Sequence, residues 1–346
     1  MLRGPFLDRN WIGQNDDYSS SDIVMLGLPF DGTVSYRSGS RFAPEQIRLA
    51  SWGLEDYSPR FDKYLQDVNF HDAGDLEFPL GNTYKKLEVI EKNVEDIYRD
   101  GKRVFGIGGE HLVTLPEIKA VSKFHKDFAI VHFDAHTDLR EEYLGEEMSH
   151  SAVIRHASKI VGPQNVKQIG IRSGMKEEFD FMKEHNTLCH KYSDLDCIKG
   201  KKIFVTVDLD VLDPSVMPGT GTPESGGMQF NELMGWFEYL KDFEIIGADV
   251  VELAPDYDAS GVSTAVATKV IRELLMFMFI RKEFFTYGTN SLSRAIRSFI
   301  FRMFFLKFFQ FGKKLVIGKI IYSRIIFNII VIIMFIYFIF QKIYSF

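Results

Sequence analysis

The chain has 346 residues, of which 46% are hydrophobic and 25% charged, so it can bury a full core. Its only cysteines, Cys189 and Cys197, exclude a disulfide framework and a zinc cluster and are compatible with a reducing cytoplasm. The N-terminal segment lacks the apolar core of a signal peptide, and the body of the chain has no basic patch with interleaved aromatic residues. We therefore expect a cytoplasmic protein that does not bind nucleic acid.

Apolar runs typical of buried strands alternate with helix-length stretches between residues 20 and 280. The strand-like runs cover residues 23–28, 103–107, 128–133, 166–171, 203–207 and 244–253, and the helix-length stretches cover residues 83–100, 151–161, 230–241 and 262–278. No linker rich in Pro, Ser or Gly interrupts the alternation. It predicts an α/β fold with three layers, α/β/α, around a mostly parallel sheet. Sites in such sheets lie beyond the carboxyl ends of the strands.

Three polar clusters each follow one of these strand-like runs. They are GGEH at residues 108–111, DAHTD at residues 134–138 and DLDVLDP at residues 208–214. Because side chains alternate along a strand, we expect the acidic residues and the histidine of DAHTD to project to one side, as do the first two aspartates of DLDVLDP. The candidate metal ligands are therefore His111, Asp134, His136, Asp138, Asp208 and Asp210.

Each of these residues alone has an ordinary structural alternative. Aspartates at strand ends often hydrogen-bond the backbone of a turn, and His111 could simply begin a helix after the Gly-Gly turn. The combination instead favours two ions that share bridging carboxylates. An oxygen-rich set of ligands with about one histidine per ion suits Mn²⁺. Two ions about 3.5 to 4 Å apart can hold a hydroxide between them and activate it as a nucleophile. The chemistry predicted is hydrolysis.

This set of motifs resembles the ureohydrolases, which hydrolyse guanidinium compounds to urea at a di-manganese centre, and the resemblance covers about residues 5 to 280. It implies the arginase-like fold and a homotrimer or homohexamer. It also implies that His111, Asp134, Asp138 and Asp208 bind one manganese and that Asp134, His136, Asp208 and Asp210 bind the other. Asp134 and Asp208 would then bridge the two ions.

The same resemblance implies catalytic roles for three residues. Glu252 in ADVVELAP would pair with the substrate guanidinium, although it could instead be a structural ion-pair partner. His150 in EMSH would pass a proton to the departing amine, and its alternative is a solvent-exposed loop histidine. Asp138 would help to hold the tetrahedral centre that forms when the metal-bridging hydroxide attacks the guanidinium carbon. A pseudoenzyme on the same fold stays open as a second class of function.

The segment after DAHTD bears on the substrate. Arg140 stands where arginases usually carry an asparagine, and this loop, with PGTGTPESGG at residues 218–227, is similar to that of the agmatinases. The resemblance therefore implies a small cationic guanidino substrate, agmatine, cleaved to putrescine and urea. Guanidinobutyrate, arginine and formiminoglutamate are the alternatives. The glutamates at 141, 142, 146 and 147 either attract a dicationic substrate or form a solvated acidic loop, and we favour the loop.

The C-terminal segment differs in composition from the rest of the chain, so we predict a catalytic domain at residues 1–282 and an atypical tail at 283–346. Residues 284–346 hold 9 Lys or Arg, no Asp or Glu, and 14 of the 32 Phe. The apolar run at 325–340 is slightly short for a bilayer span, so a membrane anchor competes with a read-through or frameshift product. We favour the read-through product and expect no membrane association unless the tail is a genuine anchor.

Overall fold

The computed structural model of the protein describes residues 10–279. The tail predicted at residues 283–346, with its two interpretations, lies outside the described residues. Within residues 10–279, none of the helices is both long enough and apolar enough to cross a membrane.

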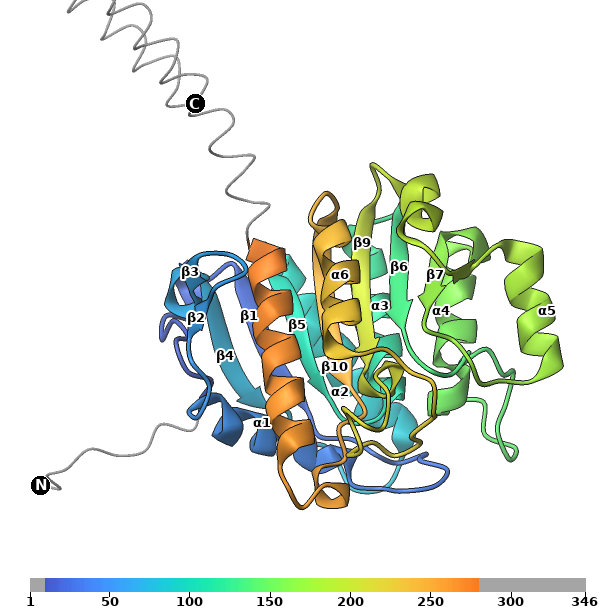
Figure 1. Cartoon of the computed structure of the whole chain (residues 1–346), viewed down its shortest axis with the longest axis horizontal. Helices are drawn as coiled ribbons and strands as arrows, with labels where there is room; N and C mark the ends of the chain where they lie inside the picture. Colours follow the sequence, from blue (N-terminus) through green and yellow to red (C-terminus); the bar gives the residue numbers. More distant parts are fainter. Residues whose placement is uncertain (1–9, 280–346) are drawn as a thin grey trace, which may run out of the picture. The chain divides into compact units, whose positions relative to one another are not determined.

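The centre of the fold is an eight-stranded sheet in the order β4-β1-β5-β10-β9-β6-β7-β8 (Figure 1), and each neighbouring pair is parallel. The strands are β1 (Ile23–Leu28), β4 (Phe70–Asp75), β5 (Arg103–Gly108), β6 (Phe128–Phe133), β7 (Val166–Ile169), β8 (Leu188–Cys189), β9 (Lys202–Asp208) and β10 (Glu244–Val251). A separate antiparallel pair consists of β2 (Tyr57–Ser58) and β3 (Lys63–Tyr64). The last strand within residues 10–279, β10, lies between β5 and β9.

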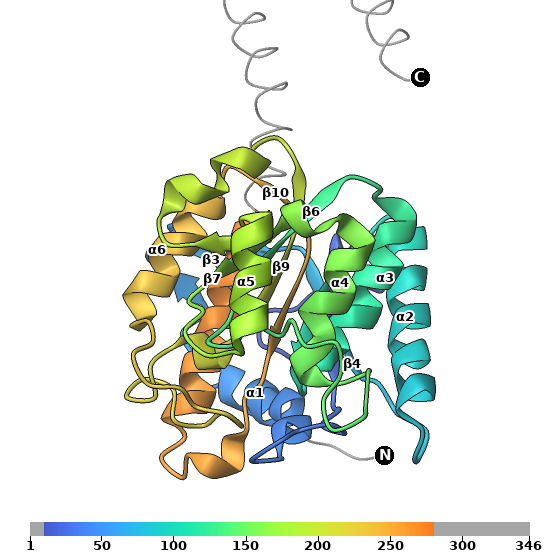
Figure 2. The same cartoon turned by 90° about the vertical axis from the view of Figure 1, so that its right-hand side faces the viewer.

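Helices cover both faces of the sheet, as predicted (Figures 1 and 2). The first face carries α1 (Ala43–Ser51), α6 (Phe230–Leu240) and a helix over residues 262–279. The second face carries α2 (Thr83–Arg99), α3 (Thr114–Phe124) and α4 (Val153–Val161), with α5 (Lys176–His185) near the β8 edge. The three-layer α/β/α prediction is therefore confirmed.

Alternation of apolar side chains along the strands fills both interfaces between sheet and helices. In β6, Ala129, Val131 and Phe133 pack on the first face, and Phe128 and Ile130 pack on the second. Burial of each large apolar side chain stabilises the fold by about 1.5 to 3 kcal/mol, so two filled interfaces hold the sheet rigidly. This rigid sheet presents the loops at the carboxyl ends of its strands in fixed positions.

Candidate metal centre and substrate pocket

The polar residues singled out in the sequence lie together at the carboxyl ends of four adjacent strands, β5, β10, β9 and β6. His111 begins a short 3-10 turn shortly after β5, and Glu252 directly follows β10. Asp208 is the last residue of β9, Asp210 lies in the 3-10 turn that follows, and residues 134–138 form the loop after β6. The parallel sheet therefore brings segments up to 141 residues apart into one site.

His111 is the centre of the first group of donor atoms. Its Nδ1 lies 3.2 Å from Asp134 Oδ2, 3.2 Å from Asp138 Oδ2 and 3.4 Å from Asp208 Oδ2. The ring is buried, and this nitrogen has no geometrically good hydrogen-bond partner, whereas Nε2 lies 2.9 Å from the Thr206 hydroxyl. Burial lowers the pKa of His111, but the three carboxylates together raise it well above its ordinary value. Nδ1 thus faces a space between three carboxylates, where the negative charges favour a cation.

Asp134, His136 and Asp210 form a second group that shares Asp134 with the first. His136 Nδ1 lies 3.0 Å from Asp210 Oδ2 and 3.4 Å from Asp134 Oδ1. The Asp210 carboxylate is oriented by the Ala135 amide, which donates to Oδ1 at 3.1 Å, and by the Thr222 hydroxyl, which donates to Oδ2 at 3.2 Å. A carboxylate that belongs to two adjacent groups is suited to bridging two ions.

The electrostatics of the two groups fit divalent cations. Burial, together with neighbouring carboxylates, raises the pKa values of Asp208 and Asp210 above the usual range. Burial also acts to raise the pKa of Asp134, but its histidine neighbours hold that pKa well below the usual range. Crowded buried carboxylates need positive charge to offset their desolvation and mutual repulsion. Carboxylate oxygens with one imidazole per group suit a hard to intermediate ion such as Mn²⁺.

The local reason for this convergence differs from the one expected. Strand β6 ends at Phe133, so the alternation predicted for DAHTD does not apply, and a loop turns its side chains inward. Asp138 adopts a left-handed backbone with φ of 51°, and its carbonyl accepts hydrogen bonds from the amides of Ile154 and Arg155 at the start of α4. Such a conformation costs about 1 to 3 kcal/mol for a residue other than glycine, so α4 must hold it in place.

Glu252 also has a left-handed backbone, with φ of 68°. Its Oε1 accepts a hydrogen bond of 2.7 Å from the His111 amide, and its own amide donates to the Gly109 carbonyl at 2.9 Å. Burial, together with the nearby Glu110 carboxylate, raises the pKa of Glu252 well above its usual value. This carboxylate is held by a backbone amide, and within residues 10–279 it forms no salt bridge. This disfavours the interpretation of Glu252 as a structural ion-pair partner.

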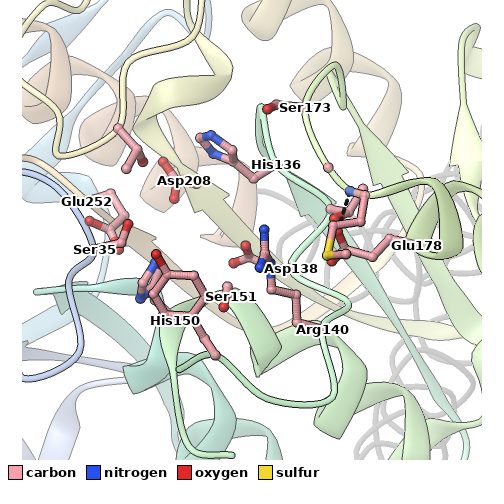
Figure 3. A pocket seen from close by; sticks show the side chains of 15 residues that line it. Ser35, His136, Asp138, Arg140, His150, Ser151, Ser173, Glu178, Asp208 and Glu252 are labelled. Carbon is pink, nitrogen blue, oxygen red and sulfur yellow. Dashed lines mark hydrogen bonds between the residues drawn. The ribbon is translucent and has the colours of Figure 1, made fainter. Parts of the chain in front are cut away.

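A pocket of about 240 Å³ opens beside the candidate centre. His136, Asp138, Asp208, Glu252 and His150 all line it, and Figure 3 shows their side chains gathered around one space. The pocket thus places two carboxylates of the cation groups, Asp138 and Asp208, within reach of the same small molecule as Glu252.

His150 is half-buried at this pocket, so the alternative of a solvent-exposed loop histidine does not describe it. Its amide donates to the Thr33 hydroxyl oxygen at 3.0 Å, and its Nδ1 lies 3.3 Å from the same oxygen. Thr33 in turn donates to the buried Glu110 carboxylate from its hydroxyl, at 2.5 Å, and from its amide, at 2.8 Å. Burial raises the pKa of Glu110 to about 7. Because the Thr33 proton goes to Glu110, the Thr33 oxygen accepts from His150.

Several of these partners were missed in the sequence. GGEH was considered only for its glycines and His111, but Gly109 is required because a Cβ there would lie 1.9 Å from the Phe30 carbonyl oxygen. That close approach brings Glu110 to Thr33. His132 was missed because it lies inside an apolar strand run, yet its Nε2 is 2.8 Å from Asp134 Oδ2. Its position two residues before DAHTD was the available signal.

The four glutamates of the loop after DAHTD do not line the pocket. The four glutamates are exposed, and Glu141 pairs with Arg155 and Lys159 of α4. None of them is among the residues that line the described pocket, which favours the interpretation as a solvated loop. Arg140 does line the pocket, and its guanidinium carbon lies 5.1 Å from the centre of the Tyr143 ring.

Comparison with known proteins identifies the lineage of this fold and site. A family model described as the arginase family matches residues 21–277. The chain belongs to the arginase family. It is 47% identical over 275 residues to an agmatinase of Bacillus subtilis strain 168, and the aligned region covers 77% of this chain and 95% of that protein. The family match and the sequence identity of 46% to 47% with agmatinases identify the chain as a hydrolase of amidine C–N bonds.

Solved structures of the arginase family agree. A Clostridium difficile protein provisionally named an agmatinase is 46% identical, with a TM-score of 0.74 over 77% of this chain and 99% of that one. The agmatine ureohydrolase of Thermoplasma volcanium is 30% identical, with a TM-score of 0.72 over 81% of this chain and 97% of that one. The predicted ureohydrolase resemblance and fold are therefore confirmed.

Proposed function

We propose that this enzyme hydrolyses agmatine to putrescine and urea and holds two manganese ions per chain. The observation that carries the chemistry is the pair of donor groups that share Asp134 beside a pocket lined by Glu252. The named agmatinases at 45% to 47% identity support the choice of substrate. The orphaned Nδ1 of His111 supports a bound cation, because a buried nitrogen without a good partner is otherwise costly.

The residues of each ion are proposed as follows. His111, Asp134, Asp138 and Asp208 would hold one ion, and Asp134, His136, Asp208 and Asp210 would hold the other. When bound, such ions act as Lewis acids and lower the pKa of water. From the resemblance to the ureohydrolases we also propose a homotrimer or homohexamer.

Glu252 positions the substrate in this proposal. One of its oxygens is anchored by the His111 amide, and the carboxylate lines the pocket, where it can accept N–H groups of a guanidinium. Resonance makes guanidinium a poor electrophile, so orientation beside the attacking water supplies much of the acceleration. Asp138, at the same pocket, accepts hydrogen bonds from the N–H groups of the tetrahedral centre.

His150 moves the protons. When water adds to the guanidinium carbon and the C–N bond breaks, both protons of that water finish on the departing amine nitrogen. His150 has its Nδ1 directed at Thr33, which leaves Nε2 for exchange with the amine. An imidazole titrates near neutral pH, and burial lowers the pKa of this one, so it returns a proton readily.

The test is urea release from a panel of guanidino compounds. We expect kcat/KM for agmatine to be at least about 100-fold above that for arginine, a difference of about 3 kcal/mol in transition-state stabilisation. A higher kcat/KM for arginine would contradict the substrate assignment. Urea release that persists fully after complete chelation would contradict the metal centre.

Arg140 favours one second candidate, guanidinobutyrate. A guanidinium at the pocket is a natural partner for a substrate carboxylate. Arg140→Gln separates the two candidates: it should leave agmatine turnover unchanged or faster if agmatine is the substrate. If guanidinobutyrate is the substrate, kcat/KM for that compound should fall at least about tenfold, the value of one lost charged hydrogen bond.

A further inference from the structure

A row of buried polar side chains crosses the centre of the sheet just below the candidate metal centre. The strand register places Gln168 of β7 beside His132 of β6, His132 beside Thr206 of β9, and Thr206 beside Asp249 of β10. All four side chains are fully buried. Central strands of a parallel sheet are usually apolar on both faces, and a buried polar group is costly without a partner. A continuous polar row there therefore calls for a function.

The first two members of the row orient Asp134. The Gln168 amide nitrogen donates to the Thr137 carbonyl at 2.8 Å, and the Thr187 hydroxyl donates to the Gln168 amide oxygen at 3.0 Å. These two bonds fix which end of the Gln168 amide faces His132, because a carbonyl can only accept. The same Gln168 nitrogen lies 3.2 Å from His132 Nδ1, so this ring nitrogen accepts. His132 Nε2 therefore carries the proton and donates to Asp134 Oδ2 at 2.8 Å.

The third member, Thr206, contacts the ring of His111. Its hydroxyl oxygen lies 2.9 Å from His111 Nε2. If Nε2 donates to this oxygen, the lone pair of the neutral ring is on Nδ1, the atom that faces the Asp134, Asp138 and Asp208 carboxylates. The partner of one imidazole nitrogen decides which nitrogen can bind a metal.

We propose that His132 and Thr206 are positioning residues for the cation centre. His132 fixes the orientation of the Asp134 carboxylate, and Thr206 fixes the tautomer of His111. His132 is not itself a ligand in this proposal, because both of its ring nitrogens already have partners within the protein. The inference rests on the proposed function only in that the centre binds divalent cations, so it can be tested without substrate.

The first experiment titrates metal-free full-length protein with Mn²⁺ and follows binding by calorimetry and bound metal by elemental analysis. Loss of a residue that orients a ligand typically weakens metal affinity 10- to 100-fold. We expect His132→Leu to show that loss with two ions per chain still reached at saturation. His132→Gln, whose amide can still donate to Asp134, should recover most of the affinity. A direct ligand would behave differently: His132→Leu would lose one ion per chain and His132→Gln would not restore it.

A second pair of variants keeps the inference testable if His132→Leu does not fold. Thr206→Val has the same shape but no hydroxyl and should weaken Mn²⁺ binding about tenfold or more, whereas Thr206→Ser should bind like the wild type. The matched control is Val131→Ala, which lies next to His132 but faces the opposite side of the sheet. It should lower thermal stability and leave Mn²⁺ affinity unchanged.

The outcomes separate this inference from the proposed function. Wild-type affinity in both His132→Leu and Thr206→Val, or an equal loss in Val131→Ala, would overturn the positioning roles while the metal centre stands. A wild-type chain that binds no Mn²⁺ would contradict both. Two ions in the wild type without urea release from any guanidino compound would contradict the proposed reaction alone.

Discussion

Thr33 offers the sharpest test of how this enzyme moves protons. It lies 117 residues before His150 and accepts hydrogen bonds from both the amide and the ring of that residue. Thr33→Val keeps the shape of the side chain and removes the hydroxyl, so His150 loses both partners. Thr33→Ser keeps the hydroxyl and is the matched control.

The size of the effect follows from those two contacts. Each neutral hydrogen bond contributes about 1 kcal/mol, and the contacts measure 3.0 and 3.3 Å, so the correct orientation of His150 loses about 1 to 2 kcal/mol. Because about 1.4 kcal/mol corresponds to a factor of ten in rate, kcat should fall roughly 5- to 30-fold in Thr33→Val. Removal of His150 itself should cost more, about 10²- to 10⁴-fold, the usual range for general acid–base catalysis.

The assay is steady-state urea release by Thr33→Val, His150→Asn and the double variant, with bound manganese and melting temperature measured for each. If Thr33 acts through His150, the double variant should be no slower than His150→Asn, and KM should change little. Losses that multiply in the double variant would contradict a role of Thr33 through His150. So would a Thr33→Ser variant as slow as Thr33→Val, because the hydroxyl would then not be the group that matters.

Three further results are expected. Asp208→Ala should abolish urea release and lower bound manganese from about two ions per chain, as measured by elemental analysis, because a bridging ligand is lost; full activity would refute this. Burial beside Asp249 raises the pKa of Glu117 well above its unfolded value, so this group should make the wild type lose stability as pH rises from about 4.5 through the folded pKa, by up to about 1.4 kcal/mol per pH unit, and Glu117→Gln should reduce the slope in urea unfolding by that contribution. An unchanged slope would contradict the buried-acid assignment. Truncation after Lys282 should leave urea release and manganese content intact, because the proposed ligands lie within residues 10–279, whereas a tail anchor predicts that only the full chain partitions into membranes.

The central strands could be predicted because they are continuously apolar. The predicted bounds of β1 and β6 match the structure, and β7 ends two residues early because Gly170 turns the chain with φ of 95°. The edge strand β4 was not predicted, since FHDAGD has few apolar residues and only part of it is buried. Helix α5 was missed for a similar reason, because KEEFDFMKEH buries only Glu178 and Met182.

The site was predictable to the extent that its chemistry is contiguous in sequence. DAHTD and DLDVLDP display their carboxylates within a few residues of a strand end, and the structure brings them together. Thr33 could not be found this way, because its role arises from a contact with Glu110, 77 residues away. The role of Thr206 likewise depends on the register of β9 beside its neighbours, which the local sequence does not specify.

The place of β10 in the sheet has a consequence for how the protein is made. The order β4-β1-β5-β10-β9-β6-β7-β8 leaves β5 and β9 joined only through β10 within the described sheet. His111 follows β5, and the carboxylates follow β6 and β9, so they belong to two parts of the sheet that no strand joins until β10 has been synthesised. Pairings this distant in sequence form slowly. A ribosome-bound chain that ends before β10 therefore carries all six proposed ligands but lacks the strand that joins the two parts of the sheet, and the same strand leads directly into Glu252.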